Sequence, residues 1–210
     1  VVLSNQQYFD IIVSEQHFSF STNLNDLIGG MTFKNSKENP PFYEYLNFIT
    51  QMQKEVTPIR QQLETAEGDI KKSLQEKATA IDSKVKKFRS DFMKNNADKF
   101  FSKIVTATTE IEIPESPLDS TGSPDKTFPY RFYKKHFWDN IDFSDERMLR
   151  TPIFYNKMDQ YLDKLTAKHP DSINVSADVL IELSKANGDI FQYVVSYITS
   201  TYERSKIMGM

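Results

Sequence analysis

The sequence predicts a mainly α-helical protein: a multi-helix bundle with a long helical hairpin, preceded by a short N-terminal β-hairpin fragment. The helices are predicted by apolar residues that recur at three- and four-residue steps along most of the chain, which is the period of one helix face. Strand-like alternation is confined to the first 36 residues. Because two or three strands are not stable alone, this region must pack on other elements.

The N-terminal β-hairpin is expected within residues 7–23. Residues 8–13 are rich in β-formers, and the segment after them alternates so that Phe18 and Phe20 share one face. A third strand is possible at residues 31–33. We expect the region to be the remnant of an N-terminal β domain, packed on the helices with an open sheet edge.

Residues 37–109 are predicted to form the helical hairpin region. The first apolar stripe consists of Phe42, Tyr45, Leu46, Ile49, Met52, Val56, Ile59 and Leu63. The second consists of Ile70, Leu74, Ala78, Ile81, Val85, Phe88 and Phe92. Pro58 predicts a kink near Glu55, and Gly68 is a weak point between the stripes. A short helix is expected from Asp98 to about Ala107.

Residues 110–127 contain three Pro, one Gly and five acids, which predicts a surface loop. Residues 128–210 are predicted to form a C-terminal helical subdomain. Its helices are expected at residues 128–140, 151–168, 172–186 and 189–207, with breaks at Pro and Gly between them. Together with residues 1–36 and 37–109, these segments give a four-part organisation.

Composition excludes several classes of function. The chain has no Cys, so thiol nucleophiles, disulfides and Cys-x-x-Cys redox chemistry are excluded, and only three His remain for metal or acid–base work. The net charge of -3 removes the electrostatic argument for a nucleic-acid partner. No apolar run approaches the roughly 20 residues of a transmembrane segment. We therefore expect no cofactor, no metal and no membrane span.

An acidic cluster could hold a divalent cation, because hard cations bind several oxygens together. It consists of Asp139, Asp142, Asp145 and Glu146. The cluster lacks the spacing of a calcium loop, and it resembles a helix start. We favour the second interpretation: Asp142 or Ser144 caps the helix, and Arg147 and Arg150 pair with the acids.

The aromatic segment at residues 128–138 has two interpretations. Core packing is favoured, because large aromatic side chains gain most from burial, and Trp138 is expected to be buried near Phe137 or Phe143. Alternatively the segment lines a ligand groove. In that case the possible partner or ligand contacts are Tyr130, Tyr133, His136 and Trp138.

Residues 137–152 read FWDNIDFSDERMLRTP, and this string resembles a helical domain of unknown function in Bacteroidetes envelope proteins. The resemblance extends upstream to residues 95–108 and 18–48, and downstream through residues 155–173 to the terminal SKIMGM, so it covers nearly the whole chain. In that family the domain usually lies between an N-terminal β domain and a C-terminal thioredoxin-like thiol–disulfide oxidoreductase domain.

The resemblance implies a non-catalytic accessory domain, either a scaffold or a client-recognition module, in the periplasm or cell envelope. Its implied partners are a thioredoxin-like domain in cis and envelope client proteins. Because that domain and its Cys-x-x-Cys are absent from these 210 residues, redox activity is not expected of this chain, and the resemblance implies no catalytic residues. Both ends look like cuts in a longer protein.

Two other functions remain open from the residues themselves. The first is a binding module for an envelope peptide or glycan that uses the aromatic segment. The second, more distant, is an enzyme that uses Asp142, Asp145 and His136, although no nucleophile stands beside that histidine in the sequence.

Overall fold

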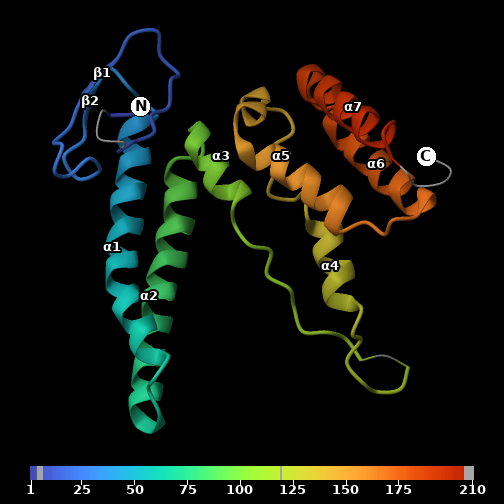
Figure 1. Ribbon diagram of the computed structural model, residues 1–210, viewed down its shortest axis with the longest axis horizontal. Coiled ribbons are helices and arrows are strands. Elements are labelled where there is room, and N and C mark those ends of the chain that lie inside the picture. The colour runs from blue at the N-terminus through green and yellow to red at the C-terminus, as the bar shows by residue number, and fades with distance from the viewer. Residues whose placement is uncertain (4–6, 119, 206–210) are drawn as a thin grey trace. The chain divides into compact units, whose positions relative to one another are not determined.

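The computed structural model describes residues 1–3, 7–118 and 120–205. These residues form seven α-helices and one two-stranded antiparallel sheet, which confirms the mainly helical fold class (Figure 1). The chain divides into two compact units, Val1–Ser102 and Lys103–Met210. The strand region of residues 1–36 therefore shares a unit with the helical hairpin. None of the helices in the described residues is long and apolar enough to cross a membrane.

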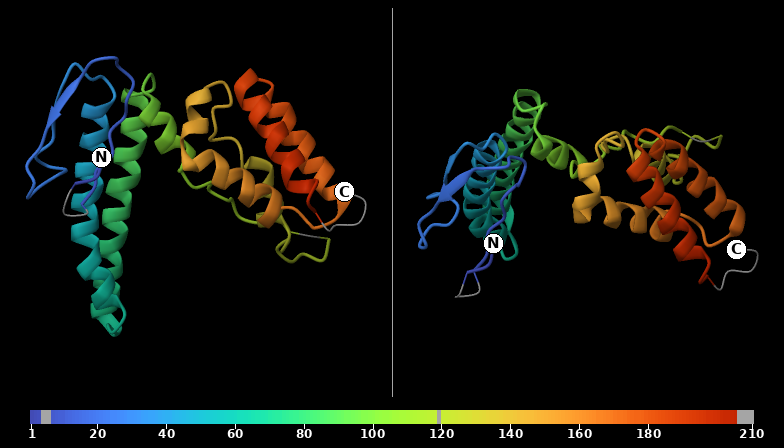
Figure 2. Two further views of the ribbon diagram at one scale, coloured as in Figure 1. Left: turned by 45° about the horizontal axis from the view of Figure 1, so that its top comes forward. Right: turned by 90° about the horizontal axis from the view of Figure 1, so that it is seen from above.

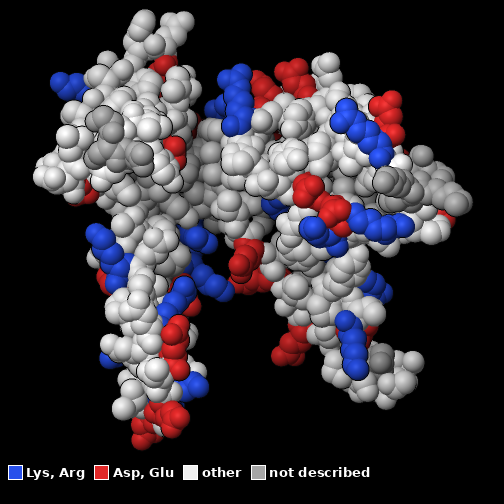
Figure 3. Space-filling model, viewed as in Figure 1, with Lys and Arg blue, Asp and Glu red and all other residues white. Residues whose placement is uncertain are grey.

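The hairpin consists of α1 (Asn39–Leu63) and α2 (Gly68–Asn95), which lie side by side (Figures 1 and 2). Met52, Val56 and Ile81 are buried between the helices. Lys, Arg, Asp and Glu side chains are interspersed with uncharged residues on the visible face of the hairpin (Figure 3), as expected for amphipathic helices.

Two breaks predicted in the hairpin have different outcomes. Gly68 begins α2 with a φ of +55°, a left-handed conformation that favours Gly, so the turn falls at the predicted weak point. Pro58 lies inside α1, which is one continuous helix from Asn39 to Leu63. The kink predicted near Glu55 therefore does not interrupt the helix.

Aromatic rings fill the end of the hairpin away from the turn. The ring centroids of Phe42 and Phe101 are 4.5 Å apart, and those of Tyr45 and Phe92 are 5.2 Å apart. The buried carboxylate of Glu38 accepts hydrogen bonds from the backbone N–H groups of Phe100 (3.0 Å) and Phe101 (3.3 Å). Glu38 thereby caps the first turn of α3 (Phe100–Ala107), the short helix that the sequence predicts.

The sheet differs from the predicted hairpin. β1 (Ser19–Ser21) pairs with β2 (Thr32–Lys34), with Phe20 opposite Phe33. The possible third strand is thus a real strand, one residue later than expected. The hairpin within residues 7–23 is wrong, because residues 8–13 form no strand and Tyr8 makes only an isolated bridge to Val2.

Side chains of α1 explain why residues 8–13 form no strand. The fully buried Asn39 amide accepts from the backbone N–H of Ile12 and donates to the Ile12 carbonyl, both at 2.8 Å. The Tyr43 hydroxyl donates to the carbonyl of Asp10 at 2.9 Å. These bonds satisfy backbone groups that a neighbouring strand would otherwise pair, so the segment is fixed to the helix.

The second unit contains the remaining helices. They are α4 (Phe128–His136), the 3₁₀ turn η1 (Glu146–Arg150), α5 (Pro152–Asp159), the π-helical turn η2 (Gln160–Lys164), α6 (Pro170–Ser184) and α7 (Gly188–Tyr202). Its fully buried core includes Phe137, Met148, Phe154, Met158, Ile173, Leu180, Ile190 and Val194. α6 and α7 lie side by side (Figure 2).

The predicted C-terminal helices are present with shifted ends. α4 ends at His136 instead of Asn140, and the helix expected to reach Lys168 ends with the π-helical turn at Lys164. The last helix, expected to reach residue 207, ends at Tyr202, and the described residues 203–205 are not helical. The described part of residues 110–127 contains no helix, and only an isolated bridge joins Leu118 to Pro124.

Candidate functional site

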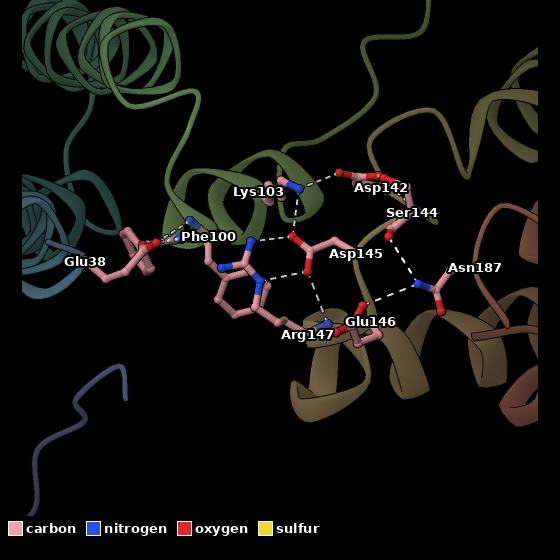
Figure 4. A network of polar contacts seen from close by, with 10 residues as sticks. Glu38, Phe100, Lys103, Asp142, Ser144, Asp145, Glu146, Arg147 and Asn187 are labelled. Carbon is pink, nitrogen blue, oxygen red and sulfur yellow. Dashed lines mark hydrogen bonds and ion pairs between the residues drawn. The ribbon is translucent and has the colours of Figure 1, made fainter. Parts of the chain in front are cut away.

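The acidic cluster forms an ion-pair network that we name the polar joint, consisting of Lys103, Asp142, Asp145 and Arg147 (Figure 4). The Lys103 ammonium lies 2.7 Å from a carboxylate oxygen of each aspartate. The Arg147 guanidinium donates two bonds to Asp145, from Nε at 2.8 Å and from its terminal nitrogen at 2.6 Å. Asp145 is only 7% exposed. This fork geometry is the strong form of a charge-assisted pair.

The electrostatics keep both carboxyl groups ionised. The hydrogen bond from Arg147 is the largest cause that holds the pKa of Asp145 far below its ordinary value, and Lys103 adds to it. Lys103 also lowers the pKa of Asp142. Burial alone would lower the pKa of Lys103, but its bonds to the two aspartates outweigh burial and raise it.

The structure confirms the capping role of the cluster but corrects its members. Asp145, not Asp142 or Ser144, caps η1, because its Oδ1 accepts from the Arg147 backbone N–H at 3.2 Å. Asp142 instead accepts from the backbone N–H of Ser144 at 2.9 Å. Arg150 is exposed and has no ion pair within the described ranges, so the pairing expected for it is wrong.

Acid should weaken the polar joint. Because the folded pKa values of Asp142 and Asp145 lie below the ordinary value of 3.8, their stabilisation is complete well above this unfolded pKa. It is lost progressively as the pH falls from the unfolded pKa through the lower folded pKa. The urea midpoint of unfolding, measured from about pH 7 down to about pH 3, should decrease once the pH is below about 4. In Asp145→Asn the urea midpoint should decrease less with acid, because one of the two carboxyl groups is gone. An identical acid dependence in this variant would contradict the assignment.

Divalent cations should not bind the polar joint with micromolar affinity. A cation would have to displace Lys103 and Arg147, and guanidinium cannot be deprotonated in proteins. Calorimetric titration with calcium, magnesium and zinc measures this directly. Saturable binding that disappears in Asp142→Ala would show a metal site and overturn the structural interpretation.

Trp138, one of the predicted contact residues, lies in the core. It is 5% exposed, and its ring centroid lies 5.0 Å from that of Phe137 and 5.5 Å from that of Phe143. Its burial beside these two rings is confirmed. Trp138 therefore presents no surface to a ligand in this conformation.

The other three predicted contact residues point to different surroundings. Tyr130 is 49% exposed and donates its hydroxyl to the carbonyl of Leu165 at 2.7 Å. His136 Nδ1 lies 2.6 Å from a carboxylate oxygen of Asp139. Tyr133 lines an open cavity. The structure thus does not gather the four residues into one surface.

The cavity beside Tyr133 is the candidate site, and we name it the α5 groove. It has a volume of about 540 Å³. Its lining includes Glu110, Ile111, Ile113, Tyr133, Asn156, Lys157 and Gln160. Glu110 and the isoleucines come from the segment after α3, Tyr133 from α4, and the other polar residues from α5 and the start of η2. The groove therefore combines an apolar side with a row of polar groups.

Lys157 is the charged group of the groove with the most distinctive setting. Its Nζ lies 4.3 Å from the centroid of the Phe137 ring and donates to the Phe137 carbonyl at 3.1 Å. Within the described ranges no carboxylate pairs with it. Burial lowers the pKa of Lys157, and no neighbouring anion offsets this effect. The groove thus contains a partly desolvated cation without a counter-ion.

Sequence reasoning missed most of the groove. Ile111 and Ile113 carried a signal, since they alternate with Glu110 and Glu112 as extended chains do. Nothing in the sequence distinguishes Lys157 from the other lysines, because its setting depends on packing.

Comparison with protein families gives a match over about two thirds of the chain. Residues 73–210 match a family described as a domain of unknown function, DUF5106. The match covers most of α2, all of α3 and the second unit, and it includes the polar joint and the α5 groove. No curated protein and no solved structure matches the chain.

Proposed function

Since the chain belongs to the DUF5106 family of domains of unknown function, we propose that it is a non-catalytic accessory domain of an envelope thiol–disulfide protein. Its role would be to recognise client proteins or to act as a scaffold for a thioredoxin-like domain in cis. The α5 groove carries this proposal, because it offers apolar surface and unpaired polar groups in one place.

The state of the candidate acids supports a non-catalytic role. The carboxylates of Asp142 and Asp145 are bound by Lys103 and Arg147, so they serve as a joint between segments. His136 bonds to Asp139 and not to a nucleophile. An enzyme built on Asp142, Asp145 and His136 would first have to break these contacts.

The thioredoxin-like partner and the envelope location rest on the resemblance of residues 137–152, which lie within the segment that matches the family. The coding sequence downstream of Met210 tests the partner. We expect a thioredoxin-like domain with Cys-x-x-Cys in the same reading frame. A stop codon at that point would contradict the proposed cis partner.

Activity of the full-length protein tests the accessory role. Deletion of residues 1–210 should leave the reduction of insulin disulfides unchanged, because this small substrate needs only the redox domain. The same deletion should slow the reduction of folded envelope proteins. If the deletion changed the reduction rate of neither substrate, client recognition would be contradicted.

A binding module that acts without a redox partner is the second candidate, and the same groove favours it. Its ligand would be an envelope peptide or glycan. Saturable ligand binding by a chain that lacks a thioredoxin-like neighbour would favour this function.

A further inference from the structure

We propose that the α5 groove binds an extended peptide, which pairs with the segment at residues 110–113 and presents a carboxylate to Lys157. The inference rests on the recognition role proposed above and specifies its ligand. Three features of the groove support it: a non-helical segment in which the backbone groups of Ile111 and Ile113 are unpaired among the described residues, a pair of side-chain amides, and a cation that none of the described carboxylates pairs with.

The segment at residues 110–113 is suited to pair with a strand. It belongs to the non-helical connection between α3 and α4 (Figure 1), and its Ile and Glu residues alternate. Within the described ranges, the backbone N–H and C=O groups of Ile111 and Ile113 have no hydrogen-bond partner. In an extended chain the backbone groups of alternate residues point to the same side. Such an edge can accept another strand by main-chain hydrogen bonds.

Asn156 and Gln160 provide a second row of hydrogen-bonding groups. They stand four residues apart, which separates them by about 6 Å along a helix axis. Alternate residues of an extended peptide are about 6.6 Å apart, a close match. Each side-chain amide donates and accepts, and neither has a hydrogen-bond partner within the described ranges. The two amides can therefore bind the backbone of alternate peptide residues.

Glu110 also lines the groove, but it is exposed and screened by solvent, so the half-buried Lys157 decides the charge of the ligand. Its partly buried ammonium lacks a paired carboxylate, and a carboxylate brought by a ligand would supply the missing counter-ion. A neutral glycan would leave this charge unpaired and would also lack backbone groups for Ile111 and Ile113. The alternating isoleucines suit apolar side chains on alternate peptide residues. The groove thus favours an acidic, partly apolar peptide over a glycan.

Selection from a library of random peptides tests the inference without a known ligand. A phage-displayed library of dodecapeptides is panned against the 210-residue chain. Enriched peptides should carry apolar residues at alternate positions together with Asp or Glu. Failure to enrich any peptide, or enrichment without an acidic residue, would overturn the proposal.

An enriched peptide, labelled with fluorescein, then measures affinity by anisotropy. Lys157→Met should weaken binding about tenfold, because it removes the charge and keeps the apolar stem. Lys135→Met is the matched control on exposed α4 surface and should bind like wild type. Replacing the peptide's acidic residue with its amide should weaken binding to wild type but not to Lys157→Met. Independent losses in the two partners would contradict the ion pair.

The backbone contacts have their own tests. Gln160→Ala should weaken binding several-fold, whereas Gln192→Ala, an exposed glutamine on α7, should not. Two peptides are compared, one N-methylated at its odd positions and one at its even positions. Only the peptide whose methyl groups replace the N–H groups that face residues 110–113 should lose binding. Equal tolerance of both registers would contradict strand pairing.

The two proposals can fail separately. If no peptide binds but deletion of residues 1–210 still slows client reduction, the ligand assigned to the groove is wrong and the accessory role stands. If peptides bind as expected but deletion has no effect, the peptide site stands and client recognition fails.

Discussion

Trp138→Ala should destabilise the second unit by about 3–5 kcal/mol. The side chain is 5% exposed and packs edge-on against Phe137, Phe143 and Tyr161, so truncation leaves a cavity that these rings cannot close. Urea unfolding followed by circular dichroism measures the change. Val175→Ala, at a 65% exposed position on α6, is the control and should cost less than about 0.5 kcal/mol.

Fluorescence gives an independent measure of the same burial. Trp138 is the only tryptophan, so the emission of the chain reports on this position alone. We expect a blue-shifted maximum and weak quenching by iodide. Emission like that of free indole would show an exposed ring. Trp138→Phe should cost less than Trp138→Ala, because it keeps an aromatic ring and removes a buried Nε1–H that has no partner among the described residues.

Asp145→Ala should destabilise the second unit by about 2–4 kcal/mol. The substitution removes the fork bound by Arg147, one of the two anions of Lys103 and the cap of η1. The cost lies below that of a fully buried pair, because solvent reaches part of both cations. Urea unfolding at neutral pH measures it.

Asp171→Ala is the matched control for Asp145→Ala, since this aspartate is exposed on the first turn of α6. It should cost about 0.5 kcal/mol or less. Asp145→Asn should fall between wild type and Asp145→Ala, because an amide oxygen can still cap η1 but carries no charge. Equal stability of Asp145→Ala and Asp171→Ala would exclude a stabilising role for the polar joint.

The helices were predictable because their signals are local. The apolar stripes of the hairpin repeat with helical period, and Pro152 and Pro170 lie in the first turns of α5 and α6, as Pro residues in many helix starts do. Gly68 marked the turn for an equally local reason, its freedom to adopt a positive φ. Fold class therefore followed from residue order alone.

The errors arose where distant residues decide the structure. Residues 8–13 carry strand propensity, but Asn39 and Tyr43 bind their backbone from α1. Lys103, 42 positions before Asp145, completes the polar joint, and nothing near the acids indicated it. The α5 groove likewise depends on the packing of three separate segments. Such contacts cannot be read from propensity or spacing.

The distribution of buried side chains along α1 and α2 makes the hairpin unequally stable along its length. Aromatic residues such as Phe42 and Phe92 are buried at one end, whereas Ile70, close to the turn, is 69% exposed. The turn end can therefore open and close without disturbing the aromatic end, and its amide protons should exchange with solvent first. We therefore expect the two helices to separate from the turn end first, without unfolding as one cooperative block.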